Sequence, residues 1–240
     1  MSVTYPQLAA IRHRIVVSCQ AGPESPLHAP HIIAALAASA ELGGAAGFRV
    51  DGPDNVAAVR AITTLPILGI NKLPESGFDV FITPTFASAN AVVDAGADLV
   101  ALDGTERPRP GGERVGEIIR CIHEECRVPV MADIATVEEG LRAAELGADM
   151  VATTLAGYTS YTAGRIGPAL DVLQALVAAT TTPVIVEGRI WTVEDVRACF
   201  EAGAYAVVIG SAITVPQFIT RRFVDAIPAD RLAVASGTRP

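Results

Sequence analysis

One short motif recurs along the chain and limits its possible folds more than any other feature. Each copy consists of a helix end, a glycine, a small residue and an apolar stretch, and clear copies begin at Asp94, Glu145 and Glu201, with a fainter one at Leu42. Further apolar stretches at 128–134 and 183–188 fall between the copies. Each interval therefore holds two strand–helix units, which predicts a chain of alternating strands and helices.

Counting these units predicts eight strands, each followed by a helix. The predicted strands are 15–20, 45–50, 66–71, 98–103, 128–134, 149–154, 183–188 and 206–211. The predicted helices are 30–42, 54–63, 86–95, 113–125, 136–146, 168–179, 192–202 and 216–227. The strands are apolar at nearly every position, as is typical of parallel strands buried on both faces. We therefore predict an α/β protein with a single (β/α)8 barrel, and regard a doubly wound open sheet as the alternative.

The bulk properties fit one barrel domain and exclude some partners. The chain has 240 residues, 50% of them apolar, which is enough for one such domain. We expect one domain over 1–240, with 1–14 as a leading arm or short helix and 228–240 as an irregular tail. A net charge of -8 argues against a nucleic-acid partner, which would need a basic face.

The expected location is the cytoplasm. No apolar run has the length of a membrane span, so we expect no membrane partner, and no leader is predicted before Tyr5. The four cysteines have no zinc-type spacing, and we expect them to be reduced thiols. No metal site is predicted.

Lys72 is the only lysine in the chain, since every other basic side chain among the eighteen is arginine. An arginine stays protonated at any usable pH, whereas a lysine amine can be tuned to give and take a proton. Lys72 directly follows an apolar run that begins after a proline, so we expect it at the carboxyl end of an inner strand. The presence of a single lysine is compatible with a reactive amine and equally with an ordinary surface lysine.

Polar side chains end all eight predicted strands, and in a barrel these ends meet at one mouth. They are Gln20, Arg49, Lys72, Asp103, Asp133, Thr154, Glu187 and Ser211. Polar groups gathered at an apolar barrel mouth are costly unless they bind one another or a ligand. Lys72, Asp133 and Glu187 come from the third, fifth and seventh strands, whose inward side chains share a layer. The pattern predicts a ligand site at this mouth.

The loops after the last two strands carry a pattern typical of phosphate binding. Gly188 and Arg189 follow the seventh strand, and Gly210 and Ser211 follow the eighth. Barrels bind phosphate at this place through backbone N–H groups. The glycines are also compatible with plain tight turns.

Two other loops contain more charged and hydroxyl side chains than simple connecting loops need. Loop 103–111 contains Arg107 and Arg109, and loop 153–159 contains several hydroxyls and Tyr158. We expect both loops to be ordered over a polar substrate. A surface salt bridge or a subunit contact fits the two arginines equally well.

Taken together, motifs at all eight strand ends resemble those of the N-acylmannosamine-6-phosphate 2-epimerase family. The motifs are Val17–Ala21, Gly69–Lys72, Ile82–Thr85, Leu102–Pro110, Met131–Ile134, Thr153–Thr159, Glu187–Arg189 and Gly210–Thr214. The resemblance runs in order from about residue 15 to 224. It implies a (β/α)8 isomerase of bacterial sialic acid catabolism that converts N-acetylmannosamine 6-phosphate to N-acetylglucosamine 6-phosphate without a cofactor.

The resemblance also assigns roles to residues. It implies that Lys72 is the catalytic proton carrier and that Glu187 is its acidic partner. The predicted substrate contacts are Gln20, Arg49, Asp133, Thr154 and Tyr158, and the predicted phosphate contacts are Gly188, Arg189, Gly210 and Ser211. The chain departs from the family at Val215, where an arginine is common. Either another arginine (Arg189, Arg221 or Arg222) compensates, or phosphate affinity is weaker, or the substrate differs.

Several alternatives stay open at this point. A Schiff-base aldolase also uses one buried lysine, and a non-catalytic sugar-phosphate binding barrel would need the same pocket. The sequence does not distinguish a one-base from a two-base epimerisation. The apolar Phe218, Ile219 and Phe223 predict a homodimer through the later helices, although they would also suit packing onto their own barrel.

Overall fold

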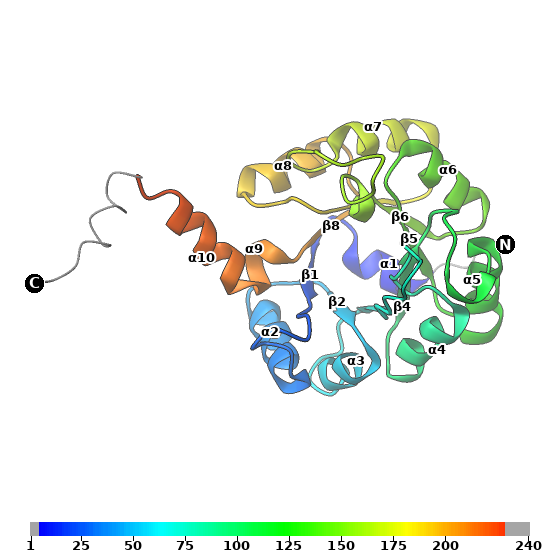
Figure 1. Ribbon diagram of the computed structural model, residues 1–240, viewed down its shortest axis with the longest axis horizontal. Coiled ribbons are helices and arrows are strands. Elements are labelled where there is room, and N and C mark those ends of the chain that lie inside the picture. Colours follow the sequence, from blue (N-terminus) through cyan, green and yellow to red (C-terminus); the bar gives the residue numbers. More distant parts are fainter. Residues whose placement is uncertain (1–4, 229–240) are drawn as a thin grey trace, which may run out of the picture.

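Eight parallel strands close into a barrel in the computed structural model, which describes residues 5–228 (Figure 1). Neighbours pair in chain order, and β8 closes the ring on β1, with Val16 opposite Val208. The strands are β1 (Ile15–Cys19), β2 (Phe48–Asp51), β3 (Ile67–Ile70), β4 (Leu99–Asp103), β5 (Val130–Asp133), β6 (Met150–Ala152), β7 (Val184–Glu187) and β8 (Ala206–Ile209). The predicted (β/α)8 barrel is confirmed.

Helices form a ring outside the strands, at or near the predicted ranges. They are α2 (Pro30–Leu42), α3 (Pro53–Arg60), α4 (Phe86–Asp94), α5 (Val115–Cys121), α6 (Val137–Glu145), α7 (Leu170–Ala179), α8 (Val193–Glu201), α9 (Ser211–Thr214) and α10 (Pro216–Asp225). A π-helical turn, η2 (Ile122–Cys126), extends α5, and short 3₁₀ turns η1 (Pro110–Gly112) and η3 (Thr153–Leu155) lie in loops. Within the predicted arm, α1 covers Pro6–Ile11. The predicted tail lies outside the described residues apart from residue 228.

The repeated motif has a local physical cause. Gly96, Gly147 and Gly203 each follow a helix end and have φ of 108°, 99° and 98°, a left-handed conformation that ends the helix and that glycine adopts without a Cβ clash. The chain then turns directly into the next strand. At the other end, α4, α6 and α8 begin with a threonine capping box. These signals fix where helices start and stop.

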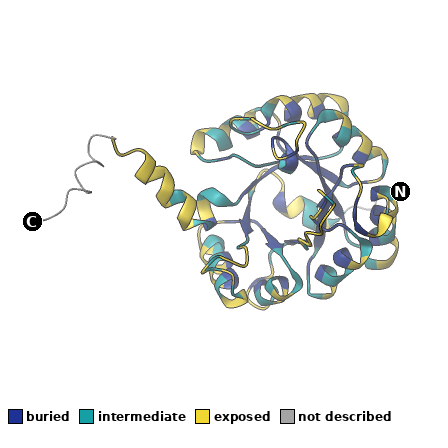
Figure 2. Ribbon diagram, in the orientation of Figure 1, coloured by how far each residue is buried: buried dark blue, intermediate teal, exposed yellow. Residues whose placement is uncertain are grey.

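The amino-terminal end of the barrel is closed. Leu68, Leu99, Met131, Met150 and Ile185 fill its interior, each 5% exposed or less. Helix α1 packs beneath them through Ile11, and Figure 2 shows the strands as the most buried part of the molecule. A ligand therefore has access only from the carboxyl-terminal mouth. None of the helices within residues 5–228 is long and apolar enough to span a membrane.

Candidate active site

A cavity of about 1120 Å³ opens at the carboxyl-terminal mouth of the barrel. This exceeds the roughly 300–1,000 Å³ typical of small-molecule sites, so a sugar phosphate has ample room. The predicted site residues that line it are Gln20, Lys72, Thr154, Tyr158, Glu187, Gly188, Arg189, Gly210 and Ser211. Arg49 and Asp133 are absent from this lining.

Arg49 and Asp133 form a buried ion pair beneath the cavity. They are 1% and 0% exposed, and Arg49 donates from Nη2 to Asp133 Oδ2 at 2.6 Å and from Nη1 to Oδ1 at 3.0 Å. A buried charge is tolerated when it is paired and hydrogen-bonded in this bidentate way. Arg49 Nη1 also donates to Glu187 Oε2 at 2.7 Å. Arg49 thus holds Glu187 from beneath the cavity, and the contact of Arg49 and Asp133 with a substrate stays a prediction.

Glu187 ends β7 and joins this buried pair to the cavity. Its Oε2 accepts hydrogen bonds from Arg49 and, at 3.2 Å, from Thr154 Oγ1. Its Oε1 accepts none from the described part of the chain, and the residue lines the cavity. Burial raises the pKa of Glu187 to about 7, with Asp133 adding to the effect and Arg49 opposing it. The carboxyl group is therefore suited to hold or release a proton near neutral pH.

Lys72 follows β3, and its backbone is held in place by contacts with two other segments. It pairs antiparallel with Ile82, and its backbone N–H donates to Asp51 Oδ1 at 2.9 Å. The side chain is exposed because the cavity is open, but the surrounding walls remove much of its water, and this desolvation lowers the pKa of the amine. The Arg49 charge lowers it further, while Asp51 opposes the change most strongly. The Lys72 amine therefore loses its proton at lower pH than the amine of a free lysine does.

Asp51 is a site residue that the sequence analysis missed. It lines the cavity, holds the backbone of Lys72 and faces the Lys72 amine. The predicted strand ends one residue earlier, at 50, whereas β2 extends to Asp51. The only available signal was a carboxylate two residues after Arg49.

Gln20 lines the cavity and has one acceptor without a partner within residues 5–228. Its Nε2 donates to Ser18 Oγ at 2.6 Å, while its Oε1 is buried without a partner among the described residues. A buried polar atom without a partner costs free energy that a ligand donor would recover. This supports the predicted contact with substrate.

Arg189 lines the cavity, but its guanidinium is held by the loop after β6. Nη1 donates to Ala156 O at 3.0 Å, Nη2 donates to Gly157 O at 2.9 Å, and the group stacks 3.9 Å from the centre of the Tyr158 ring. Its positive charge faces the cavity, and each terminal nitrogen uses one of its two N–H donors on a carbonyl. Arg189 thus ties the β6 and β7 loops together at the predicted phosphate end.

The other arginines proposed to replace the family arginine lie away from the cavity lining. Val215 itself lines the cavity. Arg222 stacks 4.4 Å from the centre of the Trp191 ring, and Arg221 lies 3.9 Å from Asp225 on α10. Arg189 is therefore the one arginine in the cavity lining of residues 5–228.

The loop after β4 is ordered by its own contacts. Arg107 pairs with the buried Asp103 at 2.7 Å, and Arg109 Nη2 donates to the carbonyls of Asp103 and Thr105. Neither arginine lines the cavity. Of the three interpretations of these arginines, a salt bridge describes Arg107.

The comparisons with known proteins agree on one family. Residues 33–229 match the family model described as "Putative N-acetylmannosamine-6-phosphate epimerase". A relative from Caldanaerobacter subterraneus, named "Putative N-acetylmannosamine-6-phosphate 2-epimerase", is 43% identical over 222 residues, covering 92% of this chain and 94% of that protein. A relative of the same name from Synechococcus elongatus is 45% identical over 225 residues, covering 93% and 97%.

A solved structure supports the same family. The N-acetylmannosamine-6-phosphate 2-epimerase from Clostridium perfringens has a TM-score of 0.89 and 40% identity, covering 92% of this chain and 96% of that chain. A thiamine phosphate pyrophosphorylase from Pyrococcus furiosus has a TM-score of 0.57 at 15% identity, covering 92% and 100%, and shares the fold alone. With a family model spanning most of the chain and relatives above 40% identity, this chain belongs to the N-acetylmannosamine-6-phosphate 2-epimerase family.

Proposed function

We propose that this protein is a cofactor-independent isomerase that interconverts N-acetylmannosamine 6-phosphate and N-acetylglucosamine 6-phosphate. The observation that carries the proposal is that Lys72 and Glu187 line one cavity in a chain of this family. Lysine has a lowered pKa there and Glu187 a pKa raised to about 7, so both are suited to proton transfer.

The chemistry requires a proton to leave C2 on one face and return on the other. In the open-chain sugar this proton lies α to the C1 aldehyde, so its removal gives an enolate. Strands β3 and β7 are four places apart in a ring of eight, which sets Lys72 and Glu187 on opposite sides of the mouth. A sugar bound between them has one proton carrier on each face. We therefore favour a two-base path, with Lys72 and Glu187 Oε1 exchanging the proton-donor and proton-acceptor roles between the two directions.

The phosphate would supply binding energy away from the reacting carbon. Backbone N–H groups near Gly188, Gly210 and Ser211 and the charge of Arg189 are the candidates for holding it. Gln20 lies on the same cavity, where its amide can bind a substrate oxygen or hydroxyl.

Turnover in heavy water tests the proposal directly. We expect the purified protein to form N-acetylglucosamine 6-phosphate from N-acetylmannosamine 6-phosphate, and the product to carry deuterium at C2, because the abstracted proton exchanges with solvent. Proton NMR of the product measures both. Absence of product would refute the activity, whereas product without deuterium would refute transfer through exchangeable side chains.

We place this reaction in the catabolism of sialic acids and in the cytoplasm. The substrate is an amino sugar phosphate, a form in which sugars are processed inside cells. All four cysteines, Cys19, Cys121, Cys126 and Cys199, are free, as expected for a reducing compartment.

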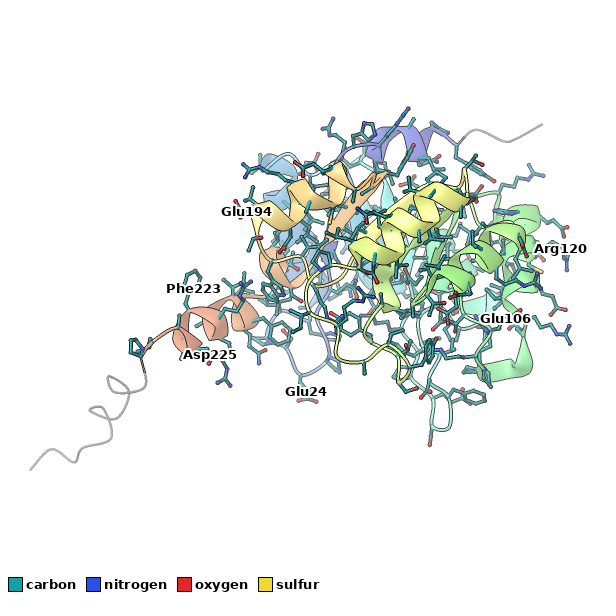
Figure 3. All side chains as sticks on the ribbon, turned by 90° about the horizontal axis from the view of Figure 1, so that it is seen from above. Glu24, Glu106, Arg120, Glu194, Phe223 and Asp225 are labelled. Carbon is teal, nitrogen blue, oxygen red and sulfur yellow. The ribbon has the colours of Figure 1, made fainter. Side chains whose placement is uncertain are left out.

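We also propose that the protein is a homodimer through α10. This helix has no buried residue and extends away from the barrel (Figures 1 and 3). Phe218, Phe223 and Val224 on it are 49%, 74% and 41% exposed. Apolar side chains gathered on one projecting helix are typical of a subunit interface, and a second copy of this chain offers a matching apolar face.

A charged residue on this helix should separate the subunits. We expect Phe223→Asp to sediment as a monomer in analytical ultracentrifugation while the wild type sediments as a dimer, because a carboxylate would be buried in the apolar contact. Val193→Asp is the matched control, since Val193 is 61% exposed on α8. A monomeric wild type, or a dimer that survives Phe223→Asp, would contradict the proposed interface.

A further inference from the structure

The hydroxyl of Thr154 lies between the two carboxylates beneath the cavity. Its Oγ1 is 2.6 Å from Asp133 Oδ1 and 3.2 Å from Glu187 Oε2. Thr154 belongs to the short turn η3, which follows β6 directly, so β6 places it between the ends of β5 and β7. The position is therefore set by the barrel itself and not by a mobile loop.

The preceding residue fixes the backbone of the same glutamate. Thr153 Oγ1 donates to the Glu187 carbonyl at 3.2 Å and accepts from the Glu187 N–H at 3.3 Å. Thr153 is 1% exposed. The Thr153–Thr154 pair thus holds one residue twice, once by its backbone and once by its carboxyl group.

A threonine hydroxyl has one hydrogen to donate but two acceptor lone pairs. When Glu187 is ionised, the hydrogen can point to either carboxylate. When Glu187 carries its proton on Oε2, Thr154 must accept from Glu187 and donate to Asp133. When the proton is on Oε1, facing the cavity, Oε2 stays free to accept from Arg49 and Thr154. The hydroxyl thus links the protonation of Glu187 to the buried Arg49–Asp133 pair.

These contacts leave the hydroxyl of Thr154 without a hydrogen to donate to a substrate. Its hydrogen is committed to a carboxylate in every protonation state of Glu187. The resemblance to the family suggested that Thr154 contacts the substrate, but the hydroxyl faces Asp133 and Glu187 instead. Thr154 does line the cavity, so a substrate could touch its remaining surface.

We infer that Thr154 is a positioning residue for the epimerisation, which fixes Glu187 Oε2 together with Arg49, turns Oε1 toward the substrate and sets the pH at which Glu187 exchanges its proton. The inference rests on the proposed function for its kinetic test. The charged groups that face Glu187 are Arg49 from β2, Lys72 after β3 and Asp133 from β5. All three remain in a Thr154 variant.

Thr154→Val removes the hydroxyl and keeps the shape of the side chain. We expect kcat to fall about 10- to 100-fold with KM changed less than about threefold, because the loss is one hydrogen bond to an ionised group and not a substrate contact. Beside an ionised Glu187 the hydroxyl can turn its hydrogen to Oε2, which stabilises the ionised form and lowers the pKa of Glu187. Its loss should therefore move the limb of the pH–rate profile that Glu187 governs to higher pH, by about one unit.

Two further variants separate this role from a general packing effect. Thr154→Ser keeps the hydroxyl and should restore kcat to within about threefold of wild type and return the pH limb to its place. Thr180→Val is a matched loss of a threonine hydroxyl at the end of α7, away from the cavity, and should leave kcat and the pH profile unchanged. Thr154→Ala serves in place of Thr154→Val if the valine variant does not fold.

The outcomes are distinct. A raised KM with an unmoved pH limb in Thr154→Val would overturn the inference in favour of substrate binding, and a lower kcat with an unmoved limb would reduce Thr154 to packing. Titration of the Glu187 side-chain carboxyl by ¹³C NMR measures the same upward pKa shift without turnover. An inactive wild type would therefore refute the proposed function, while the NMR shift would still decide the inference.

Discussion

Lys72→Arg is expected to lower kcat by about 10²- to 10⁴-fold, the range that a positioned general base contributes. Arginine keeps the positive charge and nearly the length of lysine, so substrate binding by charge alone would survive. Its guanidinium, however, stays protonated at any pH at which the protein is folded and cannot take a proton from C2. Steady-state kinetics with N-acetylmannosamine 6-phosphate measures the loss. Residual activity within about tenfold of wild type would remove Lys72 from the mechanism.

The single lysine makes its controls unusually clean. Circular dichroism and thermal melting should be close to wild type, because the side chain is exposed in the cavity and only its backbone N–H bonds Asp51. Lys72 and the N-terminus are the only amines that acetic anhydride can acylate, so the pH dependence of amide formation at Lys72, followed by mass spectrometry, reports the Lys72 pKa, which we expect below the ordinary value of 10.5. Borohydride with substrate should leave no covalent adduct, whereas an adduct on Lys72 would indicate an aldolase.

The fold was predictable because its signals are local. A helix ends where Gly96, Gly147 or Gly203 takes a left-handed conformation, and the next apolar stretch has to be a buried strand. The boundary errors fall mostly at strand starts, where the apolar run begins one to three residues before the regular strand. Residues 45–47 were predicted to begin a strand, yet β2 starts at Phe48. The chain is already hydrogen-bonded to β1 before that point, through Ala46 N–H to Ile15 O at 2.8 Å and Val17 N–H to Gly47 O at 3.0 Å, so the predicted strand is early only in where regular pairing begins.

The site was predictable only to the level of the strand ends. A polar residue at the end of a barrel strand must lie at the mouth, which brought Lys72, Thr154 and Glu187 to one cavity. Which of these side chains face the ligand depends on pairing between distant strands. Arg49 and Asp133 are 84 residues apart and bury each other, a contact with no signal in either local segment.

At the predicted phosphate end, too, the contacts depend on segments that are distant in the sequence. Arg189 was predicted as a phosphate contact from its place after β7. The carbonyls of Ala156 and Gly157 that hold it come from another loop, and Gly157 can offer its carbonyl there because it adopts a φ of 85°. Sequence spacing gives the position of a charge but not whether it is already satisfied by its neighbours.

Glu187→Gln should lower kcat by about 10²- to 10³-fold and abolish one limb of the pH–rate profile. The amide has the shape of the carboxyl group but cannot exchange a proton, so the loss is in proton transfer and KM should change little. In the wild type the limb due to Glu187 should fall near pH 7, because burial raises its pKa to about 7. The pH dependence of kcat/KM for both proteins checks this. A variant that keeps the limb would assign it to another group.

The Glu187→Gln substitution, which lowers activity, should leave the stability of the fold unchanged or increase it. A carboxyl group whose pKa is raised on folding, here from 4.5 to about 7, binds its proton more tightly in the folded state. Its contribution to stability is therefore complete below pH 4.5 and declines as pH rises to about 7. Glutamine carries no charge to bury, and Arg49 keeps its bidentate partner Asp133. We expect the Tm of Glu187→Gln at pH 8 to equal or exceed that of wild type. A clear fall in Tm would mean that the Arg49–Glu187 ion pair stabilises the fold by more than burial of the carboxylate costs, and that Glu187 is retained for structure as well as for proton transfer.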